Sequence, residues 1–349
     1  MMKTSRLLLF FIAGMLTLSA SGVTLKDNPI PVHRPLIEEY TGTWCGWCIR
    51  GIVGMELLSE TFGDDFIGVA IHNGDAMTIL STSNYPNNVN SFPNAYVERS
   101  YNVDPYYGSG ETPAGIVSFM QRLANRQTTA GIDVTAQWAD QEKSAIDVHV
   151  SNYFTIDDNS GNYAIEVMLI ADDLYGSIST WNQSNYYSGL TEYSSDPNLA
   201  PWITQPSTIR NYHFNDVLVG TSRVVNGSLP AEIKAYEVNT FDYTFTLSAL
   251  PKPALIQNKD NLHVIAIVVN KQTKKVINAN RCYIDELIIV IPGDVDDDGN
   301  VGIGDVTSLI DYILNGDDTV INSANADVDS DGEITIADVT SLIDLILNA

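Results

Sequence analysis

The sequence predicts a multidomain fold with an α/β domain, an antiparallel β-sandwich and a small α-helical domain, in that order. Three observations lead to this prediction. A cysteine pair lies between a predicted strand and a predicted helix near residue 45, residues 129–291 show a two-residue period, and an acidic motif occurs twice after residue 293. A chain of 349 residues is long enough for two or three domains.

The first residues have the pattern of an export signal. Lys3 and Arg6 precede a short apolar run, Leu7 to Leu18, and small residues follow it. The run is too short to span a membrane comfortably, so we expect residues 1–22 to be a cleaved signal peptide. A lipoprotein signal requires a cysteine directly after the apolar run, and this sequence has none there. No later stretch is apolar enough to cross a bilayer. We expect an exported protein in the periplasm, at the outer membrane or at the cell surface, where disulfides persist.

Charge restricts the classes of partner. The formal net charge is −25, which argues against a nucleic-acid-binding surface, because such surfaces need clustered Lys and Arg. The acidic residues are concentrated at the C-terminal end, where residues 293–349 hold 14 Asp or Glu and no Lys or Arg.

The cysteine pair Cys45 and Cys48 has the setting of a redox-active dithiol. Leu36 to Tyr40 alternates apolar and polar residues like a strand, and apolar residues recur at helical spacing after the pair, as far as Phe62. A helix N-terminus offers unpaired N–H groups and positive dipole charge, and both favour a thiolate on the first cysteine.

Two other interpretations of the pair remain open. A Cys-x-x-Cys motif can be half of a zinc site, but structural zinc needs four Cys or His ligands and the only other cysteine is Cys282. A purely structural disulfide is a stronger alternative. If Cys45 and Cys48 form a disulfide, whether redox-active or structural, Cys282 stays unpaired. We expect Cys282 to be a buried thiol on a strand.

The run Trp44-Cys45-Gly46-Trp47-Cys48 resembles the Trp-Cys-Gly-x-Cys active site of the thioredoxin superfamily. Glu39 stands where thioredoxins and protein disulfide isomerases carry a buried acid, and Pro93 is similar to the cis-proline that these folds place against the dithiol. The resemblance implies a thioredoxin-like domain over residues 30–128. It also implies that Cys45 attacks, Cys48 resolves the mixed disulfide, Glu39 relays a proton and Pro93 aligns the partner.

Trp47 departs from this family pattern, because thioredoxins carry Pro and isomerases carry His at that position. An indole adds no charge to stabilise a thiolate, so the reduction potential of the pair is left open. Phe66 to Ile71 is a continuous apolar run typical of a strand buried on both faces. His72 ends it and either modulates the dithiol or caps a polar loop. Ile116 to Gln127 has helical periodicity.

Residues 129–291 predict the antiparallel β-sandwich. The predicted strands include 132–136, 146–150, 241–247 and 262–269, with a hairpin loop at 271–275 before the next strand. A long insert rich in Tyr, Ser and Asn, Leu174 to Asn211, is either a binding loop or a cover for the sandwich. The order of the two domains resembles the twenty-eight-kilodalton outer-membrane protein (Omp) family of exported Bacteroidetes proteins, over about residues 30–290.

Residues 294–305 recur as residues 327–338. Each copy places carboxylates at loop positions one, three, five and twelve and glycine at six, so that oxygen ligands converge on calcium, with a ligand also at position seven. Close carboxylates repel one another without a cation, so metal binding and folding should be coupled. We expect two calcium ions, with these ligand residues: Asp294, Asp296, Asp298, Asn300 and Asp305, then Asp327, Asp329, Asp331, Glu333 and Asp338.

Each loop leads into an apolar-faced helix, Val306 to Leu314 and Val339 to Leu347. Paired loop-helix repeats of this kind resemble dockerin type I domains, here over residues 293–349, and imply a cohesin-like or other surface partner. The Ser-Thr pair that contacts cohesin is replaced by Ile303-Gly304 and Ile336-Ala337. The basic pair on the following helix is missing in both repeats.

Two hypotheses for function follow. In the first, the protein is an exported thiol–disulfide oxidoreductase that acts on a protein disulfide or a redox partner and carries a calcium-binding attachment tail. In the second, it is a non-catalytic surface or scaffold protein with a structural disulfide, linked to polysaccharide-degrading assemblies through its tail. Titration of the dithiol against a redox buffer distinguishes the two hypotheses.

Overall fold

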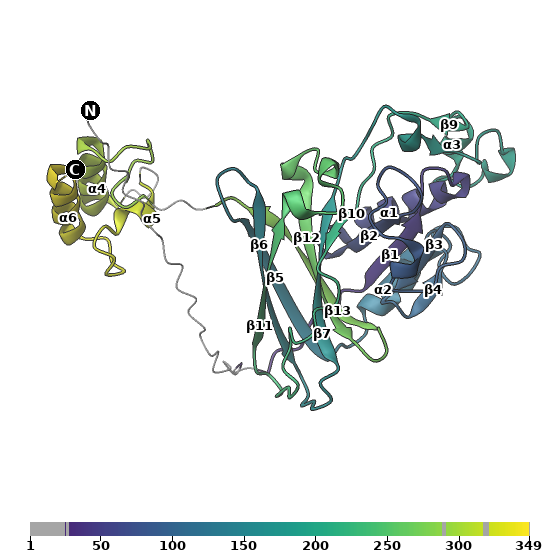
Figure 1. Ribbon diagram of the computed structural model, residues 1–349, viewed down its shortest axis with the longest axis horizontal. Coiled ribbons are helices and arrows are strands. Elements are labelled where there is room, and N and C mark those ends of the chain that lie inside the picture. Colours follow the sequence, from purple (N-terminus) through teal and green to yellow (C-terminus); the bar gives the residue numbers. More distant parts are fainter. Residues whose placement is uncertain (1–24, 26–27, 288–290, 317–320, 349) are drawn as a thin grey trace, which may run out of the picture. The chain divides into compact units, whose positions relative to one another are not determined.

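The structure is a computed structural model that describes residues 25, 28–287, 291–316 and 321–348 (Figure 1). The predicted signal peptide, residues 1–22, lies outside these residues. The chain forms two compact units, one ending at Glu286 and one beginning at Leu287.

One eleven-stranded mixed sheet organises the first unit. Its strands are β1 (Leu36–Thr41), β2 (Ile67–His72), β3 (Asn94–Val97), β4 (Tyr101–Val103), β5 (Ala130–Trp138), β6 (Ala145–Phe154), β7 (Tyr163–Ala171), β10 (Val217–Thr221), β11 (Asn239–Thr246), β12 (Leu262–Asn270) and β13 (Val276–Asp285). Their order across the sheet is β11-β6-β5-β13-β12-β7-β10-β2-β1-β3-β4. Strand β1 pairs parallel with β2 and antiparallel with β3, so it is buried from both edges.

Helices α1 (Ile49–Phe62) and α2 (Gly115–Ala124) pack on one face of this sheet. Neighbouring residues of a strand point to opposite faces. Ile37 accordingly packs with Leu58 of α1 and Met120 of α2, whereas Leu36 faces the other side and joins a core that includes residues of β7, β10 and β12. Helix α2 covers most of the predicted helix 116–127 and ends at Ala124.

The predicted sandwich strands form antiparallel ladders, but they continue the sheet of the α/β segment. Val217 of β10 pairs parallel with Ala70 of β2, while β10 runs antiparallel to β7. The first unit is therefore a single mixed α/β body rather than two separate domains. A buried ion cluster spans the same junction, because Arg99 pairs with Glu38 of β1 and with Glu166 of β7.

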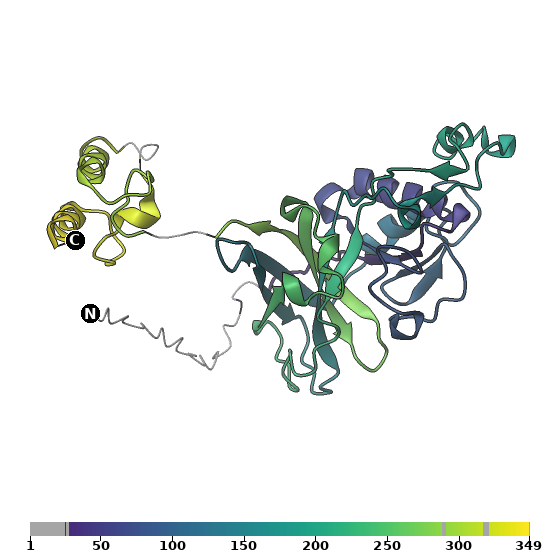
Figure 2. The same cartoon turned by 45° about the horizontal axis from the view of Figure 1, so that its top comes forward.

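The insert, residues 174–211, contains a short two-stranded sheet, β8 (Gln183–Ser184) and β9 (Thr208–Ile209), and the short helix α3 (Ala200–Ile203). In both ribbon views the segment carrying β9 and α3 lies beside helix α1 (Figure 1 and Figure 2). The insert therefore covers the α/β part of the unit, and does not lie over the antiparallel ladders.

The second unit contains α4 (Ile303–Asn315), α5 (Ser323–Ala326) and α6 (Ile336–Asn348). Leu309 of α4 and Leu342 of α6 are fully buried in one apolar cluster. The two predicted helices are confirmed, and each begins three residues earlier than the predicted apolar run.

Candidate functional site

Cys45 and Cys48 form a disulfide at the junction between β1 and α1. A single 3-10 turn, Gly46–Cys48, leads directly into α1 at Ile49. Cys48 is completely buried and Cys45 is 6% exposed, so neither cysteine lies open on the surface. The flanking side chains of Trp44 and Trp47 are exposed.

The insert is hydrogen-bonded to the main chain around Cys45. The side-chain amide of Gln183 donates to the Cys45 carbonyl at 3.1 Å, in a buried position. Next to it, the backbone N–H of Ser184 donates to the Thr43 carbonyl at 2.7 Å. The main chain on the N-terminal side of the disulfide is thus bonded to the insert at two successive points.

Aromatic side chains of the insert pack against the two residues between the cysteines, Gly46 and Trp47. The Tyr186 ring lies directly against Gly46, and a methyl group on that glycine would overlap the ring. Trp47 meets Tyr186 and Tyr187 edge-on, with ring centroids 5.7 and 5.3 Å apart. Glycine at position 46 is therefore required for the close approach of the insert.

Glu39 lies on β1 beneath helix α1 and is 2% exposed. Gly51 of α1 faces it, and a methyl group there would overlap the Glu39 carboxyl. Burial raises the pKa of Glu39 to about 8; the Thr41 hydroxyl lowers the pKa and the charge of Asp216 raises it further. Glu39 is thus a buried acid that changes protonation near neutral pH.

Pro93 is buried in the loop that precedes β3, and the Phe92–Pro93 bond is cis. Strand β3 begins at Asn94, which pairs with Tyr40 at the end of β1. The ring of Phe92 meets Trp44 edge-on at a centroid distance of 5.5 Å. The Pro93 loop therefore lies beside the residues that lead into Cys45, at the same end of β1 as Glu39.

His72 ends β2 and is bonded to a loop carboxylate. Its Nδ1 lies 2.7 Å from Asp75 Oδ2, and the same oxygen accepts from the backbone N–H of Thr43 at 2.9 Å. Burial by itself would raise the pKa of Asp75, but His72 together with the backbone N–H groups of Thr43 and Met77 holds that pKa below its usual range. His72 thus caps a polar loop, and through Asp75 it also fixes the loop before Cys45.

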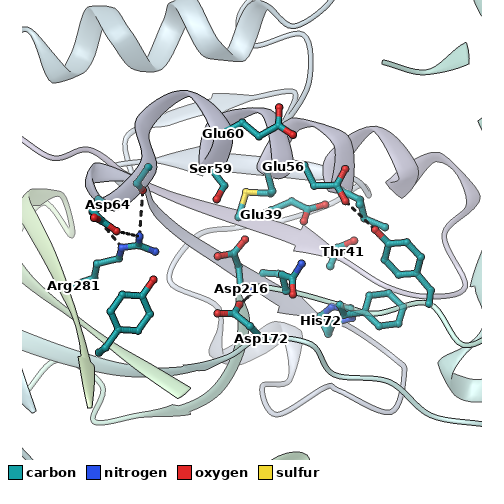
Figure 3. A pocket seen from close by; sticks show the side chains of 18 residues that line it. Glu39, Thr41, Glu56, Ser59, Glu60, Asp64, His72, Asp172, Asp216 and Arg281 are labelled. Carbon is teal, nitrogen blue, oxygen red and sulfur yellow. Dashed lines mark hydrogen bonds and ion pairs between the residues drawn. The ribbon is translucent and has the colours of Figure 1, made fainter. Parts of the chain in front are cut away.

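A cavity of about 570 Å³ opens between α1 and the strands behind it (Figure 3). We call it the carboxylate cavity. Its walls carry six acidic side chains: Glu39, Glu56, Glu60, Asp64, Asp172 and Asp216. The sequence analysis identified Glu39 alone, because the other acids come from α1, its C-terminal turn and two segments near residues 172 and 216.

Cys282 lies on β13, as predicted, but is half-buried and not fully buried. Burial raises the pKa of its thiol to about 12, with smaller contributions from Asp285 and Asp133, so it is a poor nucleophile at neutral pH.

Each acidic loop of the second unit brings three carboxylates together, at positions one, three and five in the first loop and at positions one, three and twelve in the second. In the first, ligand oxygens of Asp294, Asp296 and Asp298 lie within 4.8 Å of one another. In the second, those of Asp327, Asp329 and Asp338 do the same. The sixth-position glycines have left-handed backbone angles, φ +84° at Gly299 and +89° at Gly332, as a tight loop of this kind requires.

One buried oxygen in the first loop fits a cation. Asp294 is 1% exposed, and among the described residues its Oδ1 has no hydrogen-bond partner. Burial, with the neighbouring charges of Asp305 and Asp298, raises the pKa of Asp296. A hard divalent cation satisfies both the unpaired oxygen and the like-charge repulsion, so the donor set fits calcium.

The twelfth-position acids close each loop through its main chain. Asp305 accepts from the N–H groups of Asp296 and Gly302, at 3.0 and 2.7 Å. Asp338 does the same for Asp329 and Thr335, at 3.2 and 2.8 Å. At position five, Asp331 accepts from the seventh-position N–H of Glu333, and Asp298 accepts from that of Asn300.

Two family models match the chain. The model described as Outer membrane protein Omp28 matches residues 81–287, more than half of the chain. The chain belongs to the Omp28 family. A second model, the Dockerin type I domain, matches residues 292–347, so this Omp28-family chain carries a dockerin domain after its α/β unit. The Omp28 match begins after Cys48 and leaves the role of the dithiol open.

Two solved structures are similar to this Omp28-family chain, and the first of them shares its fold. HBP35 of Porphyromonas gingivalis is 14% identical and has a TM-score of 0.50, with 75% of this chain and 81% of that chain covered. A domain of the outer membrane lipoprotein Omp28 from the same organism is 16% identical, with 46% and 92% covered and a TM-score of 0.24. No curated protein matches the chain. No helix in the described ranges has the length and apolar character needed to cross a membrane.

Proposed function

We propose that the protein is an exported thiol–disulfide oxidoreductase with a calcium-dependent attachment tail. The observation that carries this proposal is the position of Cys45–Cys48 at the start of α1, with the buried acid Glu39 on the preceding strand. The Pro93 loop beside Trp44 adds the third part of a thioredoxin-like arrangement.

In the reducing direction, the Cys45 thiolate attacks a substrate disulfide and releases one substrate thiolate. The resulting mixed disulfide is then attacked by the Cys48 sulfur, which forms the Cys45–Cys48 bond and releases the second substrate thiol. Two electrons pass from the dithiol to the substrate. Glu39 accepts the proton of the Cys48 thiol, a role that suits an acid with a pKa of about 8.

The insert restricts which substrates reach the disulfide. A substrate sulfur can attack only where the covering Tyr186 ring and the Gln183 hydrogen bond leave Cys45 accessible. Because Cys45 is only 6% exposed, we propose an extended chain segment as the substrate, bound after a local displacement of the insert.

For the tail, we propose that two calcium ions order the loops and that the dockerin domain docks onto a cohesin-like partner. Asp294, Asp296 and Asp298 hold the first ion, and Asp327, Asp329 and Asp338 the second. Calcium supplies the positive charge that lets these carboxylates converge. Attachment in this way, and the family description, support a location at the outer membrane or the cell surface.

The burial of Cys45 favours a second candidate function. Because Cys45 is only 6% exposed, reductants and substrates reach the disulfide poorly. In this candidate function the disulfide is a structural cross-link in a surface or scaffold protein that binds through its tail. The two candidates make opposite predictions about the reduction potential.

The deciding experiment is thiol trapping of the purified mature protein across glutathione and dithiothreitol ratios. An oxidoreductase should give a potential between about −120 and −270 mV and be reduced faster than a model disulfide. A pair that stays oxidised below about −300 mV is structural, and the catalytic proposal then fails.

A further inference from the structure

The carboxylate cavity contains acids that the proposed redox chemistry does not use. Three of its acids already have partners: Glu56 accepts from Tyr212, Asp172 pairs with His263, and Asp64 pairs with Arg281. Glu60 is exposed on the outer surface of α1. Glu39 and Asp216 remain, and both line the space enclosed by helix and strands (Figure 3).

Glu39 is a buried acid with one carboxyl oxygen that lacks a hydrogen-bond donor among the described residues. It is 98% buried, and its Oε1 accepts no hydrogen bond from any residue that the structure describes. An unpaired polar group in a low-dielectric site costs free energy unless a ligand or water meets it. In the close-up, the carboxyl groups of Glu39, Glu56 and Asp216 lie around one space below α1 (Figure 3).

Two buried acids and one guanidinium determine the charge of this space. Burial raises the pKa of Asp216 to about 8, and the nearby charge of Asp172 raises it further. Arg281 is the one guanidinium that lines the cavity among the described residues, and it is bonded to Asp64 and to the main chain of Gly63. A cation that enters this space would favour the ionised form of Glu39 and Asp216, because an opposite charge nearby lowers the pKa of a carboxyl group.

The shape of the cavity distinguishes an organic cation from a metal ion. Among the described residues, the acids that place three ligand atoms within 4.8 Å are those of the two calcium loops, and none of them lines this cavity. The walls between the acids include apolar side chains, among them Ile52, Met55 and Phe214, together with polar ones such as Thr41 and Asn215. Such walls suit the methylene groups of an alkylammonium ion.

We propose that the carboxylate cavity binds a primary alkylammonium group, with Glu39 and Asp216 as its acceptors. An ammonium offers three N–H donors and one positive charge, which matches an unpaired buried oxygen beside a second carboxylate. Its source is either a lysine side chain of a partner protein or a free polyamine. Glu39 also serves the proposed redox chemistry, but the test measures ammonium binding with the disulfide oxidised, so its result does not depend on thiol exchange.

The test is calorimetric titration of the full mature chain, with calcium saturating the tail and the disulfide oxidised. The probes are n-butylammonium, spermidine, a blocked lysine tripeptide and, as the neutral control, n-butanol. We expect n-butylammonium to bind and n-butanol not to bind. Asp216→Asn, which keeps the side-chain size, should weaken binding by about tenfold or more, because it removes a charged acceptor.

Glu60→Gln is the matched control, since Glu60 is an exposed acid of the same cavity. It should change the affinity by less than about twofold. Thermal unfolding of each variant establishes that it is folded, and Glu39→Gln provides a second measurement of the same site. Equal binding of n-butanol, or equal affinity of the wild type and Asp216→Asn, overturns the proposal. Tighter binding of spermidine than of the peptide identifies a free polyamine, and the reverse identifies a partner's lysine.

Discussion

The side chain of Gln183 donates a buried hydrogen bond to the main-chain carbonyl of Cys45, across 138 residues of sequence. Gln183 is 1% exposed, so this bond is made inside the protein and not on its surface. The insert is therefore held against the main chain of the disulfide by a buried hydrogen bond.

Loss of this bond should make the disulfide easier to reach. We expect Gln183→Ala to raise the rate of reduction by dithiothreitol by roughly threefold to tenfold, because a buried hydrogen bond contributes about 1 kcal/mol to the closed arrangement. The rate is measured by thiol trapping at fixed times. Gln205→Ala, at an exposed glutamine of the same insert, is the control and should leave the rate unchanged. Equal rates for wild type and Gln183→Ala would show that the insert does not limit access.

Glu39 should make the first unit less stable as pH rises. Its pKa in the folded protein is about 8, against an ordinary value of 4.5, so the folded state holds a proton that the unfolded chain releases. The stabilising contribution is complete below pH 4.5, falls as pH rises and is lost above about pH 8. A shift of this size corresponds to at most about 5 kcal/mol.

Glu39→Gln should reduce this dependence, leaving the part that Asp216 contributes, and should make the first unit more stable than wild type at pH 9, while Glu60→Gln should not. Urea unfolding followed by tryptophan fluorescence measures the effect, because all five tryptophans lie before residue 287 and report only on the first unit. Parallel pH curves for wild type and Glu39→Gln would mean that the Glu39 carboxyl titrates normally.

Arg99 should be essential for the stability of the first unit. It pairs with Glu38 at 2.8 Å and with Glu166 at 2.7 Å, and all three side chains are buried. Arg99→Met leaves two buried carboxylates without a cation and should cost about 3–5 kcal/mol. Arg34→Met is the control, since Arg34 pairs with the exposed Asp65 at the same 2.7 Å and should cost less than about 1 kcal/mol. Denaturant unfolding compares the two variants, and similar losses would contradict the assigned role of burial.

Each calcium loop should bind one ion. We expect calorimetry to give two calcium ions per chain, and Asp327→Asn to reduce this number to one, because position one supplies a ligand that no other residue replaces. Asp311→Asn, at an exposed acid of α4 outside both loops, should keep two. A chelator should unfold the second unit while the tryptophan fluorescence of the first unit stays constant. Unchanged stoichiometry in Asp327→Asn would exclude the second loop as a site.

Patterns within short segments of the sequence predicted those helices and strands whose own residues carry a clear apolar period. The apolar period of 36–40 and of 49–62 gave β1 and α1 within one residue, and the repeated loops gave α4 and α6. Strand β7 was missed although it pairs with both β10 and β12, because Tyr163–Ala171 is buried almost throughout and has no two-residue period. The sequence also does not show that one sheet runs through both predicted segments before residue 292, because the pairing of Val217 with Ala70 joins residues far apart in sequence.

The candidate site was predictable only where one segment carries it. The Cys45–Cys48 pair and Glu39 lie within ten residues of each other, so a motif can identify them. The Gln183 contact and the Asp216 carboxyl depend on chain packing across more than a hundred residues. No periodicity marks the Tyr-rich insert as the cover of a disulfide, and that role became visible only through its hydrogen bonds to Thr43 and Cys45.

The single sheet makes the N-terminal segment inseparable from the rest of the first unit. A fragment that starts at residue 81, where the family match begins, lacks both β1 and β2. Strand β3 then loses its partner β1, and β10 loses β2, so two rows of backbone N–H and C=O groups in the middle of the sheet become open edges. Such edges recruit strands from other chains. Truncation or domain exchange at this point would therefore produce a fragment that aggregates. The segment that carries the cysteines cannot be separated from the sheet, because its strands β1 and β2 complete that sheet.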